Sequence, residues 1–217
     1  MRKIKLLAVL VFIIGQTFGQ KYSHKQDNSG FISLIEFLTN RSKYSDSFII
    51  NKRTKSDIKA WGGSDYKIES TDELITKKII RKEIWGVYKN DTLYLNGIPI
   101  TGLIGYAKVE ILGKYSFLRP AYPVNMKIQN ELGLNDPMYG YMFGAVGGAI
   151  QGAQMAVKRI PLVYNMETGE KFLLTEINIE KLLDRFSELK AEFEKESDKK
   201  NEEVLLRYLK RLNELDK

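Results

Sequence analysis

The feature that most constrains the fold of this chain is a series of short apolar runs separated by turn-forming residues. Runs so short and so closely spaced are joined by tight turns, which make antiparallel rather than parallel neighbours. Three such pairs lie at 79–88 with 92–95, 106–112 with 115–119, and 162–165 with 171–174, and single runs lie at 48–50, 57–61 and 65–69. We therefore expect an antiparallel β-sheet or a partly open barrel of short strands.

Apolar residues at helical spacing occur on both sides of this β-rich region. Residues 30–39 predict a first helix, with Asn28 or Ser29 as its N-cap. Two apolar stripes, separated by a polar break at 196–200, predict a C-terminal αα-hairpin over 175–217, with Asn201 capping its second helix. The fold class is therefore α+β, with the hairpin packed on the sheet.

An uncharged, glycine-rich segment, 137–157, interrupts the strands. Asp136 and Pro137 are typical of a helix start, and Lys158 of a helix end, so we expect one helix inserted between strands. Its candidates for helix packing or interaction recur at four-residue spacing and make one side nearly flat: Gly144, Gly148, Gly152 and Ala156. Such a helix packs within the domain, self-associates or contacts a membrane. Its many glycines and glutamines favour the first.

The first 19 residues have the three-part pattern of a secretory signal peptide. Arg2, Lys3 and Lys5 precede an unbroken apolar run, and small residues follow it, so cleavage is expected between Gly19 and Gln20. A membrane-spanning helix needs about 20 apolar residues, and this run has about half that number. The sequence predicts export.

The absence of cysteine narrows the compartment and the chemistry. Lipoprotein anchoring, disulfides and zinc–thiolate sites all need cysteine, so none of them is expected. The expected location is the periplasm, the outer-membrane periphery or the extracellular space. The expected organisation is a signal peptide at 1–19, a flexible leader at 20–29, an α+β domain at 30–174 and the helical hairpin at 175–217.

The sequence contains no recognisable catalytic or cofactor motif. His24 is the only histidine and lies in the leader, which argues against histidine-based triads and metal sites. No phosphate-binding loop is present, and the glycine-rich segment is not a dinucleotide fingerprint because it does not follow a strand. No catalytic residue, cofactor or metal is therefore expected. Four carboxylates in or beside strands could serve a carboxylate-only hydrolase: Asp57, Asp65, Asp91 and Glu110.

Charge and aromatic residues point to an ordinary folded surface and core. The net charge of +7 includes three residues of the signal peptide, and the other charges are interspersed. Nucleic-acid binding needs clustered Lys and Arg, so no nucleic-acid partner is expected. Trp61 and Trp85 lie in predicted strands, which favours core packing over a stacking platform for sugars.

Four stretches of the sequence, 56–68, 83–96, 142–152 and 162–175 with the two helices that follow, resemble a group of exported proteins from Bacteroidota. That group is a domain of unknown function. The resemblance covers most of the chain after the signal peptide and implies export and a single domain. It carries no catalytic residue over to this sequence.

These observations favour a non-enzymatic exported domain that binds an envelope or extracellular protein. One alternative is a membrane-associated protein that uses the Gly144/Gly148/Gly152 helix. The other is the carboxylate-only hydrolase.

Overall fold

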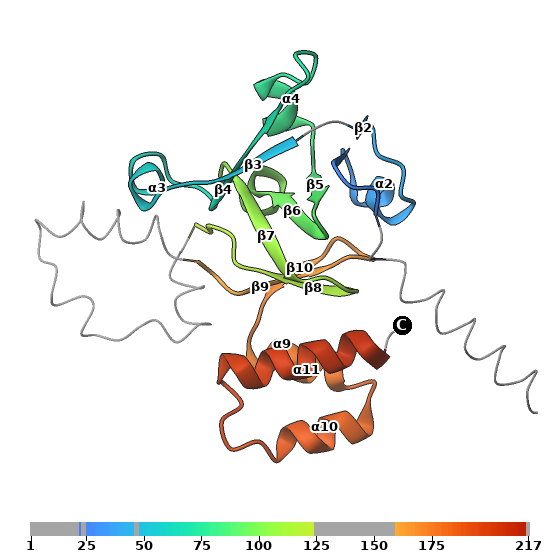
Figure 1. Cartoon of the computed structure of the whole chain (residues 1–217). Helices are drawn as coiled ribbons and strands as arrows, with labels where there is room; N and C mark the ends of the chain where they lie inside the picture. Colours follow the sequence, from blue (N-terminus) through green and yellow to red (C-terminus); the bar gives the residue numbers. More distant parts are fainter. Residues whose placement is uncertain (1–21, 23–24, 46–47, 124–158, 216–217) are drawn as a thin grey trace, which may run out of the picture.

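The computed structural model describes residues 22, 25–45, 48–123 and 159–215 (Figure 1). The signal peptide with Gly19 and Gln20, the histidine at position 24 and the glycine-rich segment lie outside the described residues. The expectations for the segment's four small residues, Gly144, Gly148, Gly152 and Ala156, therefore fall outside them as well.

Antiparallel strands form the centre of the described fold. Their order is β10-β9-β8-β7-β6-β5-β1-β2, and β4 pairs with both β3 and β7. The strands are β1 (Ser29–Phe31), β2 (Tyr44–Ser45), β3 (Phe48–Lys52), β4 (Tyr66–Ser70), β5 (Gly86–Lys89), β6 (Thr92–Asn96), β7 (Tyr106–Ile111), β8 (Tyr115–Leu118), β9 (Leu162–Asn165) and β10 (Lys171–Leu173). The helices are α2 (Leu34–Leu38), α3 (Lys55–Trp61), α4 (Lys77–Lys82), α5 (Gly97–Thr101), α9 (Glu176–Leu183), α10 (Ser187–Glu194) and α11 (Glu202–Leu215). The structure confirms the α+β class with an antiparallel sheet that does not close.

Strand β7 is the point at which the sheet divides. One edge of β7 pairs with β6. Strand β7 has two further partners: Tyr106 pairs with Tyr66 of β4, and Val109 pairs with Leu118 of β8. The sheet therefore separates near the middle of β7 into a curved arm that holds β3 and β4 and a second arm made of β8, β9 and β10 (Figure 1).

The hydrophobic core lies in three clusters that these arms separate. Helix α4 and the curved arm enclose one cluster, which includes Ile80 and Tyr106. A second, which includes Trp85, lies between β5–β7 with α2 on one side and β8–β10 on the other. The third joins the opposite face of β8–β9 to the C-terminal helices, which lie below these strands in Figure 1. Both faces of β8 and β9 are thus buried.

Hydrogen bonds also attach the C-terminal helices to the sheet. Asn213 on α11 accepts a hydrogen bond from the Tyr115 amide at 2.8 Å and donates one to the Tyr115 carbonyl at 3.0 Å. The C-terminal region is helical as predicted. The first helix of the expected hairpin, however, is interrupted at residues 184–186 and forms two helices, α9 and α10. None of the helices in the described ranges is both long and apolar enough to cross a membrane.

Two predicted strand segments are wrong, and side-chain capping explains both. Residues 57–61 belong to helix α3, because Thr54 and Asp57 form a reciprocal capping box that starts a helix. Residues 79–82 belong to α4, because Thr76 caps the Ile79 amide. The hairpin itself is confirmed over β5 and β6, whose turn residues Asn90 and Asp91 have the positive φ angles that such a turn needs.

The first predicted helix begins later than expected. Its N-cap is Ser33 rather than Asn28 or Ser29, and the helix is limited to Leu34–Leu38. Residues 29–31 instead form β1, because they pair with β5 on one side and β2 on the other. Sheet pairing over three residues thus replaces the first turn of the expected helix.

Candidate functional site

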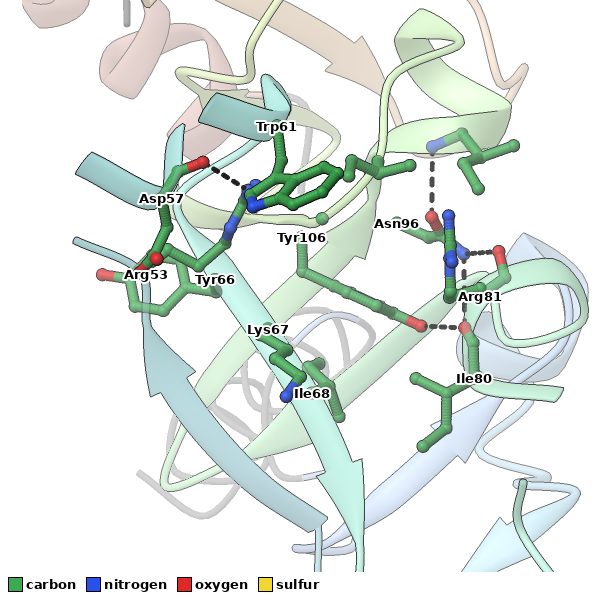
Figure 2. A pocket seen from close by; sticks show the side chains of 13 residues that line it. Arg53, Asp57, Trp61, Tyr66, Lys67, Ile68, Ile80, Arg81, Asn96 and Tyr106 are labelled. Carbon is green, nitrogen blue, oxygen red and sulfur yellow. Dashed lines mark hydrogen bonds between the residues drawn. The ribbon is translucent and has the colours of Figure 1, made fainter. Parts of the chain in front are cut away.

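A pocket of about 660 Å³ lies between helices α3, α4 and α5 and the start of β7 (Figure 2). Its aliphatic lining comes from four isoleucines: Ile68, Ile80, Ile98 and Ile104. Its aromatic and polar lining consists of Arg53, Asp57, Trp61, Tyr66, Lys67, Arg81, Asn96 and Tyr106, and Gly105 completes the wall. Volumes of about 300–1,000 Å³ with a largely apolar lining are typical of binding sites for small groups.

Two buried polar residues fix the floor of this pocket. The Tyr106 hydroxyl donates to the Ile80 carbonyl, as the dashed line in Figure 2 shows, and burial raises the pKa of Tyr106 well above its usual value. The Asn96 amide donates to the carbonyls of Arg81 at 2.9 Å and Ile84 at 2.8 Å. These bonds satisfy carbonyls at the C-terminal end of α4, which would otherwise be left without partners.

The Asn96 carbonyl oxygen, at the other end of the same amide, accepts from the Ile98 amide at 3.1 Å and so caps α5. One side chain thereby holds two walls of the pocket together.

Helix α3 and the loop after it form the opposite wall, and Arg53 holds them. Its guanidinium donates to the Gly62 carbonyl at 2.7 Å and to the Ser64 carbonyl at 3.0 Å. Asp57 accepts from the hydroxyl and the amide of Thr54, and these bonds lower the pKa of Asp57. The Arg53 guanidinium and one carboxylate oxygen of Asp57 are thus committed to the wall itself.

Gly63 allows this wall to approach α5 and β7. Its φ is +85°, and a Cβ atom there would lie 2.2 Å from the Ile104 carbonyl oxygen. The Ser64 amide, next in the chain, donates to that same oxygen at 2.7 Å. The glycine therefore closes the pocket at the end where Ile104 and Gly105 lie.

The rim of the pocket carries two side chains that are free to meet a ligand. Trp61 is 76% exposed at the end of α3, so the expectation that it packs in the core is wrong, whereas Trp85 is 8% exposed and belongs to the core. Arg81 is exposed on α4, and within the described ranges no hydrogen bond or ion pair involves its guanidinium. The rim therefore offers an indole face and a positive charge.

A second cavity, of about 490 Å³, gathers two of the four carboxylates noted in the sequence. Asp65 and Glu110 both line it, and each is ion-paired: Asp65 with Arg159 and Glu110 with Arg119. The other two lie elsewhere, because Asp57 is in the first pocket and Asp91 accepts from the Tyr88 hydroxyl at 3.2 Å.

In the part of the chain that the structure describes, no group of three or more His, Cys, Asp or Glu side chains is arranged to hold a metal ion. The sequence singled out only Asp57 and Trp61 among the pocket residues, because the lining comes from six separate elements and the loops between them. The capping pattern Thr54-x-x-Asp57 was the one local signal that could have placed Trp61 on a helix end.

Comparison with known proteins identifies a family for this chain but no activity. Neither the curated proteins nor the solved structures gave a match. One family model matches residues 29–216, and its description is a family of unknown function, DUF6563. The match covers the strands, the pocket and the C-terminal helices, and the chain belongs to this family of unknown function.

Proposed function

We propose that this protein is a non-enzymatic binding domain whose first pocket receives an apolar side chain from a partner protein. The observation that carries the proposal is the exposed indole of Trp61 at the rim of an isoleucine-lined pocket. An exposed tryptophan beside an apolar cavity has water on a face that a ligand could cover. Trp, Tyr and Arg are also the residues that contribute most to binding energy at protein interfaces.

The polar groups of the pocket favour an apolar occupant over a sugar. A sugar needs several free donors and acceptors around its hydroxyls. Here Asn96, Tyr106 and Arg53 already bond to backbone carbonyls, and Asp57 already accepts from Thr54. Apart from the Arg81 guanidinium at the rim, what remains open is largely isoleucine surface and the face of Trp61.

The remaining charge at the rim favours an acidic neighbour for that apolar side chain. Arg81 presents a guanidinium that the described structure leaves without a bonding partner, and guanidinium groups bind carboxylates in two parallel hydrogen bonds. We therefore infer an occupant of one chemistry: an apolar side chain within an acidic segment of protein.

We also propose that the partner is an envelope or extracellular protein, which rests on the signal-peptide pattern of the first 19 residues. Export with cleavage would leave Gln20 as the first residue of the mature chain. Intact mass of the protein recovered from its native host checks this. A mass that retains residues 1–19 would contradict export by cleavage.

A labelled peptide tests the pocket directly. The probe has one phenylalanine among serine, glycine and aspartate residues, and its binding is followed by fluorescence anisotropy. We expect replacement of the phenylalanine by alanine, or the variant Trp61→Ala, to weaken binding about tenfold or more, since each removes the apolar contact.

The matched control is Ile177→Ala, which truncates another exposed apolar residue, 64% exposed, on the remote helix α9. Its affinity should equal that of the unmodified protein. Equal binding of the phenylalanine and alanine peptides, or an unchanged affinity in Trp61→Ala, would contradict the proposal.

A further inference from the structure

The second cavity lies where the two arms of the sheet separate. Strand β4 contacts β7 at Tyr66 and Tyr106, and three residues later Val109 of β7 pairs with β8 instead. The space left between the diverging strands is lined by residues from β3, β4 and β7 and by two arginines that follow β8 and precede β9: Lys52, Asp65, Tyr66, Lys108, Glu110, Arg119 and Arg159.

Two lysines that line this cavity take no part in its ion pairs. Asp65 accepts from the Arg159 Nε at 2.9 Å, and Arg119 is bonded to both Glu110 and Glu202. Both arginines are therefore neutralised. Lys52 and Lys108 are exposed, and no hydrogen bond or ion pair within the described ranges involves either ammonium group. The cavity thus has an excess of positive charge at two adjacent strands.

The two cavities lie next to each other, because they share Tyr66 in their lining. Side chains two residues apart on a regular strand point to the same face, so Tyr106 and Lys108 share one face of β7, and Glu110 follows where the register with β8 shifts. Tyr106 lines the first pocket, and Lys108 and Glu110 line the second. Tyr66 lines both and forms the wall that they share.

We propose that the two cavities form one bipartite site for an extended acidic peptide segment, with the apolar side chain in the first and a carboxylate in the second. This inference rests on the proposed function of the first pocket. Tyr106 and Lys108 are two strand positions apart, which corresponds to about 7 Å. An extended peptide has the same repeat. The peptide residue whose carboxylate binds Lys108 and Lys52 should therefore lie two positions from the residue whose apolar side chain fills the first pocket.

Two peptides that differ in one functional group test the spacing and the charge. Both carry phenylalanine in a serine–glycine background, and the residue two positions later is glutamate in one and glutamine in the other. We expect the glutamate peptide to bind about three- to tenfold more tightly at low salt, with the difference falling as ionic strength rises. Lys108→Ala, and more fully Lys52→Ala with Lys108→Ala, should remove this difference without weakening the glutamine peptide.

Lys210→Ala is the matched control, because Lys210 is an exposed lysine on α11 and lines neither cavity. It should leave the preference for glutamate intact. A glutamate preference that survives the loss of both cavity lysines would overturn the bipartite site. So would a third peptide, with glutamate one residue from phenylalanine, that binds as tightly as the spaced one.

Inorganic phosphate separates this inference from the proposed function. Competition by phosphate for the glutamate peptide but not for the glutamine peptide supports a carboxylate site that is distinct from the apolar pocket. Phosphate binding without any effect on the glutamate peptide would mean a separate anion site and would overturn the inference. If phenylalanine itself makes no contribution, it is the proposed function that fails.

Discussion

Asn96 is the single residue that connects most parts of the first pocket. It is 2% exposed, and its amide bonds to the end of α4 on one side and to the start of α5 on the other. A buried amide with all its bonds made is rigid. It can therefore hold two helices at a fixed separation, which an apolar residue of the same size could not do.

We expect Asn96→Ala to destabilise the fold by about 2–4 kcal/mol, because it removes the donor to the Arg81 carbonyl and the N-cap of α5, and leaves the Ile80 and Ile84 carbonyls with the Tyr106 hydroxyl alone. Urea unfolding measures the change. Asn51→Ala is the control: Asn51 is exposed on β3 and bonds only to Glu69, so its removal should change the stability by less than about 0.5 kcal/mol. Equal effects of the two substitutions would mean that the Asn96 network does not stabilise the pocket.

At the scale of elements, a carboxylate just after α10 links that helix to α11. Glu196 accepts from the Tyr208 hydroxyl at 2.7 Å and from the Arg207 guanidinium at 2.6 Å. The Tyr208 bond and then the Arg207 bond lower the pKa of Glu196 below its ordinary value. Glu192 of α10 also pairs with Arg211 of α11, and apolar contacts such as the edge-to-face pair of Phe193 and Tyr208 complete the interface.

The sign of the resulting pH dependence follows from that lowered pKa. The stability that the ionised carboxylate contributes is complete above the pKa of Glu196 in the unfolded chain, and it is lost as the pH falls through the lower folded value. We expect a carboxyl-carbon NMR titration to show Glu196 titrating below an ordinary glutamate, and Tyr208→Phe to raise its pKa. Tyr88→Phe, which removes a tyrosine bonded to Asp91 instead, should leave it unchanged.

Elements whose turns are coded locally were predictable from the sequence. The β5–β6, β7–β8 and β9–β10 hairpins were expected because turn residues lie between their apolar runs, and the structure confirms them. Helices α3 and α4 were not predicted because they are short and because β-type residues follow their capping threonines, Thr54 and Thr76. The split between α9 and α10 was missed because one apolar stripe continues across it.

The candidate site could not be predicted because it depends on contacts between distant segments. Arg53 reaches the loop after α3, Asn96 reaches α4, and Arg159 reaches Asp65 across 94 positions of the chain. No periodicity in the sequence reports such contacts. Trp61 illustrates the difficulty. The residues around it suggested a strand in the core, whereas it is exposed because it lies at the end of helix α3.

At the scale of the whole molecule, β8 and β9 form the layer that joins the two halves of the fold. Leu118 and Leu162 pack into the core that contains Trp85, whereas Phe117 and Val163 pack into the helical cluster. Adjacent residues of the same strands therefore serve opposite faces. A loss of packing against the C-terminal helices should therefore also destabilise the cluster that contains Trp85, since both clusters depend on the same two strands.

This coupling predicts that the protein unfolds as one unit. Leu209 is fully buried among the C-terminal helices, and Leu209→Ala should cost about 2–5 kcal/mol. In a Trp61→Phe background, fluorescence reports Trp85 alone, and circular dichroism at 222 nm reports the helices. We expect Leu209→Ala to shift both urea midpoints equally, although Trp85 lies in a different cluster. Leu215→Ala, which truncates a residue that is 57% exposed on the same helix, should move neither. If the helical signal shifted while the Trp85 midpoint stayed in place, α9–α11 would be a separately unfolding appendage and the shared layer would not couple the two halves.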